Sequence, residues 1–224
     1  MARPKRINKG GVVYHVSNRA NGRLKIFKKP SDFEAFEQIL SEAIERFDMR
    51  LCSYCIMSNH WHLVLWPRDD GDLSSFMKWL TVTHSHRWHG SHGTKSCGHL
   101  YQGRFKSFPV QSGSYYRTLL QYVESNPLRA KLVAKPADWQ WGSCATRSGV
   151  AKPFKLSAGP VRLAKSWLAY VEDYASIDTK VKSVLEEAFT RGAPFGDKDW
   201  QLAIATELEL ESTLKPLGRP RKGV

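Results

Sequence analysis

The stretch SNHWHLVLW, residues 58–66, places two histidines one residue apart at the start of an apolar run. Alternate residues of a β-strand point to the same face of a sheet. His60 and His62 would therefore project together, while Trp61 and its apolar neighbours pack on the opposite face. Two imidazoles arranged in this way can supply two ligands to one divalent cation, although a pair of polar surface histidines has the same spacing.

The segments around this strand predict an antiparallel sheet. RLCSYCI (50–56) has the composition of a strand and a short turn joins it to residue 60, so the two strands form a hairpin. The capping-box sequence from Ser31 to Glu34 opens an amphipathic helix. Further strands are expected at 10–19 and 100–110. Further helices are expected at about 73–88 and from Ser112 or Ser114 to Asn126. The resulting order, β-α-β-β-α-β-α, predicts an α+β fold with a ferredoxin-like antiparallel sheet and helices on one face.

The sequence changes character after Ser143. A loop-like stretch at 148–160 precedes two or three helical segments, at about 161–171, 177–190 and 197–209. We therefore expect a first domain over 1–145, a helical C-terminal extension over 146–214 and a basic tail over 215–224. The tail contains GRPRK, which resembles the core of an AT-hook, although a basic end that only interacts with solvent is the alternative.

Charge predicts the partner of this chain. The formal net charge is +13, and residues 1–30 contain nine Lys/Arg and no Asp or Glu. Residues 91–135 contain seven Lys/Arg and only Glu124 as an acid. Two acid-poor blocks favour a polyanion such as nucleic acid. No run approaches the ~18 apolar residues of a membrane span, so we expect no membrane partner.

The cysteines and the N-terminus predict a reducing, cytoplasmic environment. We also expect the chain to be associated with the nucleoid. No apolar segment follows the basic N-terminus, so a signal peptide is not expected. Cys52 and Cys55 form a CxxC, but they lie in a strand-like stretch and no second CxxC exists. We interpret them as buried structural thiols rather than zinc ligands.

A candidate nucleophile and a third ligand occur together in YRTLLQYVESNP. Tyr122 and Asn126 are four residues apart and share one face of a helix. If that face lies over His60 and His62, the site holds two imidazoles, an amide oxygen and a phenol. Such a mixed nitrogen and oxygen site suits a divalent metal, Mg²⁺ or Mn²⁺. The alternative is that Tyr122 is a half-buried helix aromatic and Asn126 a helix C-terminal cap.

These residues resemble a known family. SNHWHLVLW is similar to the HUH motif, two histidines separated by a hydrophobic residue, of single-tyrosine HUH nucleases. GGVVYHVSNRANGRLKIF, GHLYQGRFKSF, YVESNPLRAKLV and DWQWGS are similar in order and spacing to REP-associated tyrosine transposases, relatives of insertion-sequence transposases that handle single-stranded DNA. The resemblance covers about residues 1–145. One departure is Ala20, where the family pattern has the glycine of an Arg-Gly pair.

The resemblance implies a role for each matching residue. His60 and His62 match the metal-binding pair, Asn126 the third metal ligand and Tyr122 the catalytic nucleophile that forms a 5′-phosphotyrosine bond. Tyr115 and Tyr116 are weaker rivals as nucleophiles. The implied substrates are palindromic REP-type hairpins in single-stranded DNA.

Basic residues are expected to bind the DNA. The candidates are Arg3, Lys5, Arg6, Arg19, Arg23, Lys95, Arg104, Lys106, Arg129, Arg219 and Arg221. The dense histidines between His84 and His92 are interpreted as a polar or phosphate-contacting stretch, with a second metal site as the alternative.

The sequence therefore predicts a metal-dependent single-stranded DNA endonuclease and strand transferase, acting as a monomer or homodimer. The rival hypothesis is a non-catalytic, domesticated regulator that binds specific DNA sequences with the same basic surface. Both predict salt-sensitive binding, but only the enzyme needs a tyrosine beside a metal site.

Overall fold

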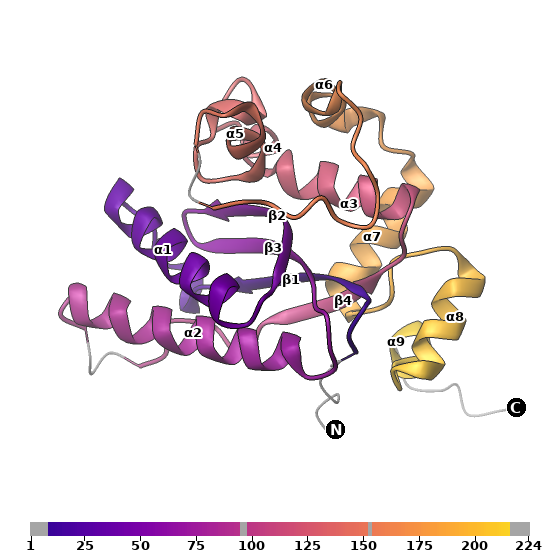
Figure 1. Ribbon diagram of the computed structural model, residues 1–224, viewed down its shortest axis with the longest axis horizontal. Coiled ribbons are helices and arrows are strands. Elements are labelled where there is room, and N and C mark those ends of the chain that lie inside the picture. The colour runs from indigo at the N-terminus through magenta and orange to yellow at the C-terminus, as the bar shows by residue number, and fades with distance from the viewer. Residues whose placement is uncertain (1–8, 95–97, 152–153, 216–224) are drawn as a thin grey trace, which may run out of the picture.

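The computed structural model describes residues 9–94, 98–151 and 154–215. Its centre is one antiparallel sheet with the strand order β2-β3-β1-β4. The strands are β1 (Val13–Arg19), β2 (Arg50–Met57), β3 (His60–Trp66) and β4 (Lys106–Val110). This order and direction of strands confirm the ferredoxin-like α+β class expected from the sequence (Figure 1).

The helices fall into two groups along the chain. The first group comprises α1 (Pro30–Arg46), α2 (Asp72–Ser91), α3 (Ser114–Glu124), α4 (Asn126–Arg129) and α5 (Ser143–Ser148). The second group comprises α6 (Trp167–Glu172), α7 (Thr179–Arg191), α8 (Lys198–Glu207) and α9 (Glu211–Leu214). Short 3₁₀ turns lie at Asn21–Arg23, Pro136–Asp138 and Tyr174–Ser176. Within the described residues, no helix is both long and apolar enough to cross a bilayer.

Pairing between β1 and β3 fixes which side chains share a face of the sheet. Ser17 lies opposite His62, and Arg19 lies opposite His60. On β3, Trp61, Leu63 and Leu65 belong to a first hydrophobic core, formed with α1 and α2. Val64 belongs to a second core, on the face that also carries the two histidines. The alternation expected of SNHWHLVLW is therefore present.

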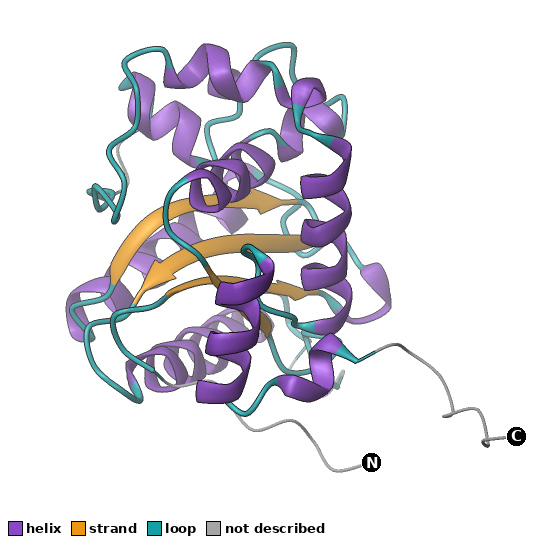
Figure 2. Ribbon diagram, turned by 90° about the vertical axis from the view of Figure 1, so that its right-hand side faces the viewer, coloured by secondary structure: helices purple, strands orange, loops and turns teal. Residues whose placement is uncertain are grey.

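Helix α3 covers this second face. Leu119, Leu120 and Val123 from α3 pack in the second core with Val64 and Phe108 of the sheet. Figure 1 shows the strands between α1 and α2 on one side and α3 on the other, and Figure 2 shows the same layers after a quarter turn. The structure thus has the expected helices on one face and adds a second helical layer, because both faces of the central strands are apolar.

The C-terminal extension contributes to the same second core. Trp167, Leu185 and Phe195 are buried there beside the sheet residues. Phe195 also pairs with the free edge of β4: its backbone N–H donates to the Pro109 carbonyl, and its carbonyl accepts from the Gln111 N–H, both at 2.9 Å. The extension therefore protects an edge strand that would otherwise expose backbone donors and acceptors. The domain boundary near residue 145 stays a prediction.

A buried carboxylate ties the extension to α3. Glu124 is 2 % exposed and accepts hydrogen bonds from Ser53 Oγ at 2.8 Å, Trp167 Nε1 at 2.8 Å and Arg147 at 3.2 Å. The Cys144 thiol lies 3.3 Å from its second oxygen. A buried charge needs such partners, since an unpaired one is strongly destabilising. Glu124 thereby fixes the position of α3 from the side opposite Tyr122.

Two helix boundaries differ from the sequence prediction. Helix α1 begins at Pro30, with Lys29 as its N-cap, and the Asp32 carboxylate accepts from the Lys28 and Lys29 N–H groups. The capping box expected at Ser31 is wrong because Pro30 favours the first helical position, where its missing N–H is not needed. The helix expected to run to Asn126 instead breaks at Ser125 and resumes as α4.

The described cysteines, Cys52, Cys55 and Cys144, are buried and free. Burial raises the pKa of the Cys55 thiol above its ordinary value, so it stays protonated and inert. The expectation of structural thiols is confirmed for Cys52 and Cys55.

His84 gives the fold a testable dependence on pH. It is a buried residue of α2, and its Nδ1 lies 2.6 Å from the Tyr101 hydroxyl. Burial lowers the pKa of His84 to about 3, whereas an exposed imidazole titrates near 6.5. Below about pH 6.5, His84 therefore binds a proton in the unfolded chain before it does so in the folded protein. Its free energy of unfolding should fall as pH drops from about 6.5 towards 3, by up to ~1.4 kcal/mol per pH unit for this one group.

Chemical denaturation of wild type and His84→Gln at several pH values measures this effect. The variant should show a shallower fall in stability below pH 6.5. His86→Gln is the matched control, because His86 is exposed two residues further along the same helix. Equal slopes for wild type and His84→Gln would contradict the assignment.

Candidate active site

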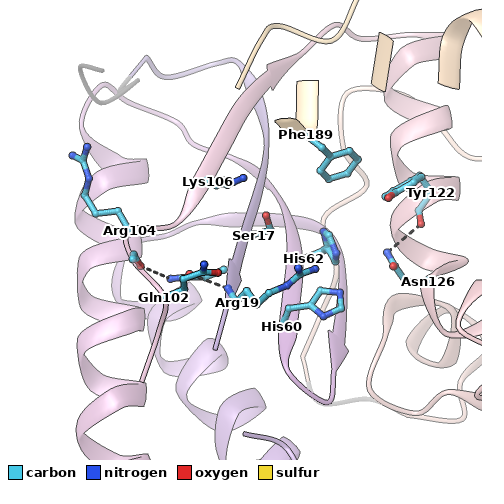
Figure 3. A pocket seen from close by; sticks show the side chains of 12 residues that line it. Ser17, Arg19, His60, His62, Gln102, Arg104, Lys106, Tyr122, Asn126 and Phe189 are labelled. Atoms are coloured by element: carbon cyan, nitrogen blue, oxygen red, sulfur yellow. Dashed lines mark hydrogen bonds between the residues drawn. The ribbon is translucent and has the colours of Figure 1, made fainter. Parts of the chain in front are cut away.

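A cavity of about 660 Å³ opens on the second face of the sheet. Segments far apart in the sequence contribute to it: β1, β3, the approach to β4, α3, α4 and α7. The lining residues are Ser17, Asn18, Arg19, His60, His62, Gln102, Gly103, Arg104, Lys106, Tyr122, Asn126 and Phe189 (Figure 3). All four residues singled out for the metal and the nucleophile are among them.

His60 presents one defined ring nitrogen to this cavity. Its Nδ1 lies 2.7 Å from the Asn59 side-chain oxygen, which can only accept, so His60 Nδ1–H donates. The Asn59 amide nitrogen in turn donates to the Arg23 carbonyl at 3.3 Å, which fixes the orientation of that amide. His60 Nε2 therefore keeps its lone pair and is free to bind a cation.

His62 is also held by a contact at its Nδ1 atom. Its Nδ1 lies 2.8 Å from Nε2 of His15, a buried residue of β1. Nε2 is then the ring nitrogen of His62 that remains for the cavity. The centroids of the His60 and His62 rings are 5.1 Å apart and the rings are nearly perpendicular, at 84°.

Both imidazoles are neutral at pH 7. Burial is the largest cause that lowers the pKa of His60, to about 4, and the charges of Arg19 and Arg129 lower it further. Burial also lowers the pKa of His62 well below its ordinary value, with the neighbouring imidazoles and the same arginines adding to the effect. A metal ligand must be unprotonated, so this environment prepares both side chains for coordination.

Asn126 acts as a helix cap and still leaves an oxygen available. Its amide nitrogen donates to the backbone carbonyls of Tyr122 and Val123, both at 3.3 Å. The capping role considered from the sequence is therefore present. Because the nitrogen is used, the amide oxygen is the atom that can act as a ligand, and the cap holds it in one orientation.

The ring of Tyr122 lies between an aromatic and a cation. The Phe189 ring centroid is 4.8 Å from that of Tyr122, at an interplanar angle of 38°. The guanidinium carbon of Arg129 lies 3.8 Å from the Tyr122 ring centroid, and Arg129 also donates to the Tyr122 carbonyl at 3.2 Å. These contacts limit the rotation of the phenol and favour one direction for its hydroxyl.

The rival tyrosines do not line the cavity. Tyr116 is 1 % exposed and belongs to the second core. Tyr115 packs edge-on against Phe195, with ring centroids 5.1 Å apart. Among the tyrosines of the described segments, Tyr122 is therefore the one that lines this cavity together with His60 and His62.

Charge around the cavity is positive. Arg19, Arg104 and Lys106 line it, and none of its described lining residues is acidic. Arg23 is exposed but is not a lining residue. Arg3, Lys5, Arg6, Lys95, Arg219 and Arg221 lie outside the described residues, as does the AT-hook-like GRPRK. Ala20 is buried and pairs with Tyr101 in an isolated antiparallel bridge, so the departure from Arg-Gly leaves this turn well packed.

A second, wider cavity of about 920 Å³ adjoins the first. The two share Asn18, Gln102, Gly103 and Arg104, and the second continues over α2 past Lys78, His86 and His89. Phe105 lines this cavity, whereas Tyr101, which also touches it, is mostly buried and hydrogen-bonded to Trp61.

The two imidazole nitrogens and the amide oxygen at this cavity are donors that could hold a divalent cation. Within the described segments, no group of three or more His, Cys, Asp or Glu could hold a metal. That finding argues against a second metal site among the histidines from 84 to 92. It is compatible with the set expected here, which combines only two imidazoles with an amide oxygen.

Two residues that contact the proposed site residues are absent from the sequence prediction: His15, which contacts His62, and Phe189, which packs on Tyr122. His15 is hidden because a histidine in a strand shows no sign of its partner 47 residues away. Phe189 comes from α7, whose apolar spacing predicts a buried helix face but not which cavity that face adjoins. Pairing with β3 is the one signal that could have suggested His15, since it would lie on the same face as His62.

Packing of Phe189 over Tyr122 can be tested by chemical modification. Phe189→Ala should expose the phenol ring and raise its rate of nitration by tetranitromethane several-fold, measured by mass spectrometry of the peptide containing Tyr122. Tyr115 packs on Phe195 instead and is an internal control whose rate should not change. An unchanged rate at Tyr122 would contradict the packing described here.

Comparison with known proteins agrees with the fold. Residues 8–126 match the family model described as "Transposase IS200 like". The fold is similar to that of a REP-associated tyrosine transposase solved bound to a REP hairpin, with a TM-score of 0.55 and 17 % identity over 73 % of this chain and 100 % of that one. A candidate transposase from Deinococcus radiodurans matches 55 % of this chain and 97 % of its own, with 17 % identity and a TM-score of 0.41. No curated protein matches this chain.

Proposed function

This chain belongs to the IS200-like transposase family, a class of DNA-processing enzymes, and on that premise we propose that it cuts and rejoins single-stranded DNA through Tyr122. The observation that carries the proposal is the shared cavity, where Tyr122 and Asn126 meet His60 and His62. A phenol and two neutral imidazoles, in a site whose described charged lining residues are all cations, are suited to attack on a phosphodiester.

A divalent cation, Mg²⁺ or Mn²⁺, completes this proposed site. His60 Nε2, His62 Nε2 and the Asn126 amide oxygen would hold it, because the other polar atoms of these side chains are already hydrogen-bonded. When bound, the cation polarises a non-bridging oxygen of the scissile phosphate and offsets the charge that develops there.

The proposed reaction is a transesterification. The Tyr122 hydroxyl oxygen attacks phosphorus, the bond from phosphorus to the 3′ oxygen breaks, and the phenolic proton passes to solvent. The departing oxygen takes up a proton and leaves as a 3′-hydroxyl, while the 5′ phosphate stays on Tyr122. The covalent link conserves the energy of the broken bond, so another 3′-hydroxyl can reverse the reaction without ATP.

The cations around the cavity would position the DNA backbone. Arg19, Arg104 and Lys106 line the cavity and would contact phosphates on either side of the scissile one. Arg129 is already stacked on the Tyr122 ring, so its charge lies close to the attacking oxygen. The adjoining cavity over α2 offers room for the strand that continues from Arg104, with Phe105 available for stacking on a base.

The proposed substrate is a palindromic REP-type hairpin in single-stranded DNA. The resemblance of the sequence motifs to REP-associated tyrosine transposases supports this choice, as does the hairpin bound to the protein of similar fold. The basic segments 1–8 and 216–224 would add phosphate contacts, which remain predictions.

The first test replaces the nucleophile. Tyr122→Phe keeps the ring that packs between Phe189 and Arg129 but lacks the attacking oxygen. Cleavage of a labelled single-stranded hairpin in Mn²⁺ should fall at least about 1000-fold, and the denaturation-resistant adduct should vanish. Hairpin affinity should stay within about three-fold, because the cations are untouched.

Tyr115→Phe is the matched control and should cleave like wild type, since Tyr115 lies outside the cavity. If Tyr122→Phe still forms the adduct, the catalytic assignment is wrong. If wild type binds the hairpin and never cleaves it under any metal condition, the regulator hypothesis gains instead.

The second test removes the cation. EDTA should stop cleavage, and Mn²⁺ in excess should restore it. His60→Ala should lose at least about 100-fold in cleavage, because one imidazole ligand is gone, and should retain hairpin binding. Cleavage at the wild-type rate in EDTA would show that Tyr122 acts without a metal.

A further inference from the structure

His15 is a buried polar residue that the proposed chemistry has not used. It lies in the middle of β1 and is only 1 % exposed. Its Nε2 lies 2.8 Å from His62 Nδ1, while its own Nδ1 is buried without a hydrogen-bond partner among the described residues. A buried polar atom with no partner is unfavourable, and an apolar side chain at this position would avoid it.

The strand register explains how His15 reaches His62. Ser17 lies directly opposite His62, so His15, two residues earlier on β1, is the diagonal neighbour on the same face. Its direct partners across the two neighbouring strands are Val64 and Phe108. The neighbours of this position are therefore core residues, whereas His15 itself is polar.

Aromatic packing holds the His15 ring in one orientation. The Phe108 ring stacks on it, with centroids 4.8 Å apart and an interplanar angle of 27°. The Phe189 ring meets it edge-on, with centroids 4.7 Å apart and an angle of 75°. A ring enclosed in this way cannot turn without moving both phenylalanines, so Nε2 stays directed at His62.

The proton in the hydrogen bond between the two rings can belong to either His62 or His15. In the first arrangement, His62 Nδ1–H donates to His15 Nε2, and His62 Nε2 keeps its lone pair. In the second arrangement, His15 Nε2–H donates to His62 Nδ1, so the proton of the neutral His62 ring lies on Nε2. Only the first arrangement lets His62 bind a cation from the cavity. His60 already has the corresponding arrangement, since its Nδ1–H donates to Asn59.

We propose that His15 is a positioning residue that accepts the Nδ1 proton of His62 and so presents His62 Nε2 to the cation. This proposal rests on the proposed function, because it gives the role of His15 in the same metal site. Ligand histidines commonly use their second nitrogen in this way, through a carboxylate, a carbonyl or water. Here a third imidazole, packed between two aromatic rings, serves that purpose.

The test compares two substitutions at this position. His15→Leu removes the acceptor and keeps an apolar side chain in the core. His15→Gln keeps an acceptor oxygen at a similar reach. Binding of Mn²⁺ to the full chain without DNA, followed by electron paramagnetic resonance, should weaken about 10- to 100-fold in His15→Leu and stay within a few-fold in His15→Gln.

The matched control is His84→Leu. His84 is another fully buried histidine, in the other layer of the fold, and it is bonded to Tyr101 rather than to a proposed ligand. His84→Leu should bind Mn²⁺ like wild type. Thermal melting of each variant checks that the chain is folded, so a loss of affinity is not mistaken for a loss of structure.

A second measurement reads the proton directly. Imidazole ¹⁵N chemical shifts of wild type at pH 7, without metal, should show His62 protonated on Nδ1 and bare on Nε2. His62 protonated on Nε2 would overturn the role of His15, whether or not the variants fold. So would unchanged Mn²⁺ affinity in a folded His15→Leu. If wild type binds no Mn²⁺, the proposed metal site fails, and the ¹⁵N shifts still decide the His15–His62 contact.

Discussion

The antiparallel register between β1 and β3 is the constraint on which the whole site depends. With Ser17 opposite His62, both histidines of SNHWHLVLW face the second core, and His15 lies within hydrogen-bonding distance of one of them. Because side chains alternate along a strand, a slip of one residue would turn His60 and His62 into the first core and Trp61 into the cavity. Burial of Trp61 against α1 and α2 therefore fixes the orientation of the two imidazoles.

Helix α3 has two sides with separate roles. Tyr122 faces the cavity, as does Asn126 at the start of α4, while Glu124 points into a buried network with Ser53 and Trp167. That network ties α3 both to the sheet and to the C-terminal extension. Phe189 of the same extension then packs on the Tyr122 ring. The extension thus contacts α3 at two points, Glu124 and the proposed nucleophile Tyr122, although the family model matches only residues 8–126.

Sequence reasoning predicts the elements of this molecule well and their contacts less completely. The alternation in 58–66 and the i, i+4 pair of Tyr122 and Asn126 are local patterns, and the structure brings both to one cavity. The start of α1 differs from the prediction because Pro30 takes the first helical position, so the capping box at Ser31 does not form. The Phe189–Tyr122 and His15–His62 contacts are tertiary contacts. Each joins residues far apart in the sequence, so no local pattern predicts it.

The cavity differs from a simple DNA-binding surface in one physical respect. A surface that only holds phosphates needs cations, and Arg19, Arg104 and Lys106 would be sufficient for it. The cavity adds three groups whose remaining free atoms suit a cation: His60 Nε2, His62 Nε2 and the Asn126 oxygen. Their second polar atoms are all used to orient them, and Tyr122 lies beside them.

The most direct measurement of this claim is a crystal soaked in Mn²⁺, with the metal located by its anomalous scattering. We expect one manganese in the cavity, bonded to His60 Nε2, His62 Nε2 and the Asn126 side-chain oxygen, with the Tyr122 hydroxyl facing the open side of the metal. Manganese bound elsewhere, or His62 rotated to present Nδ1 after breaking its contact with His15, would contradict it.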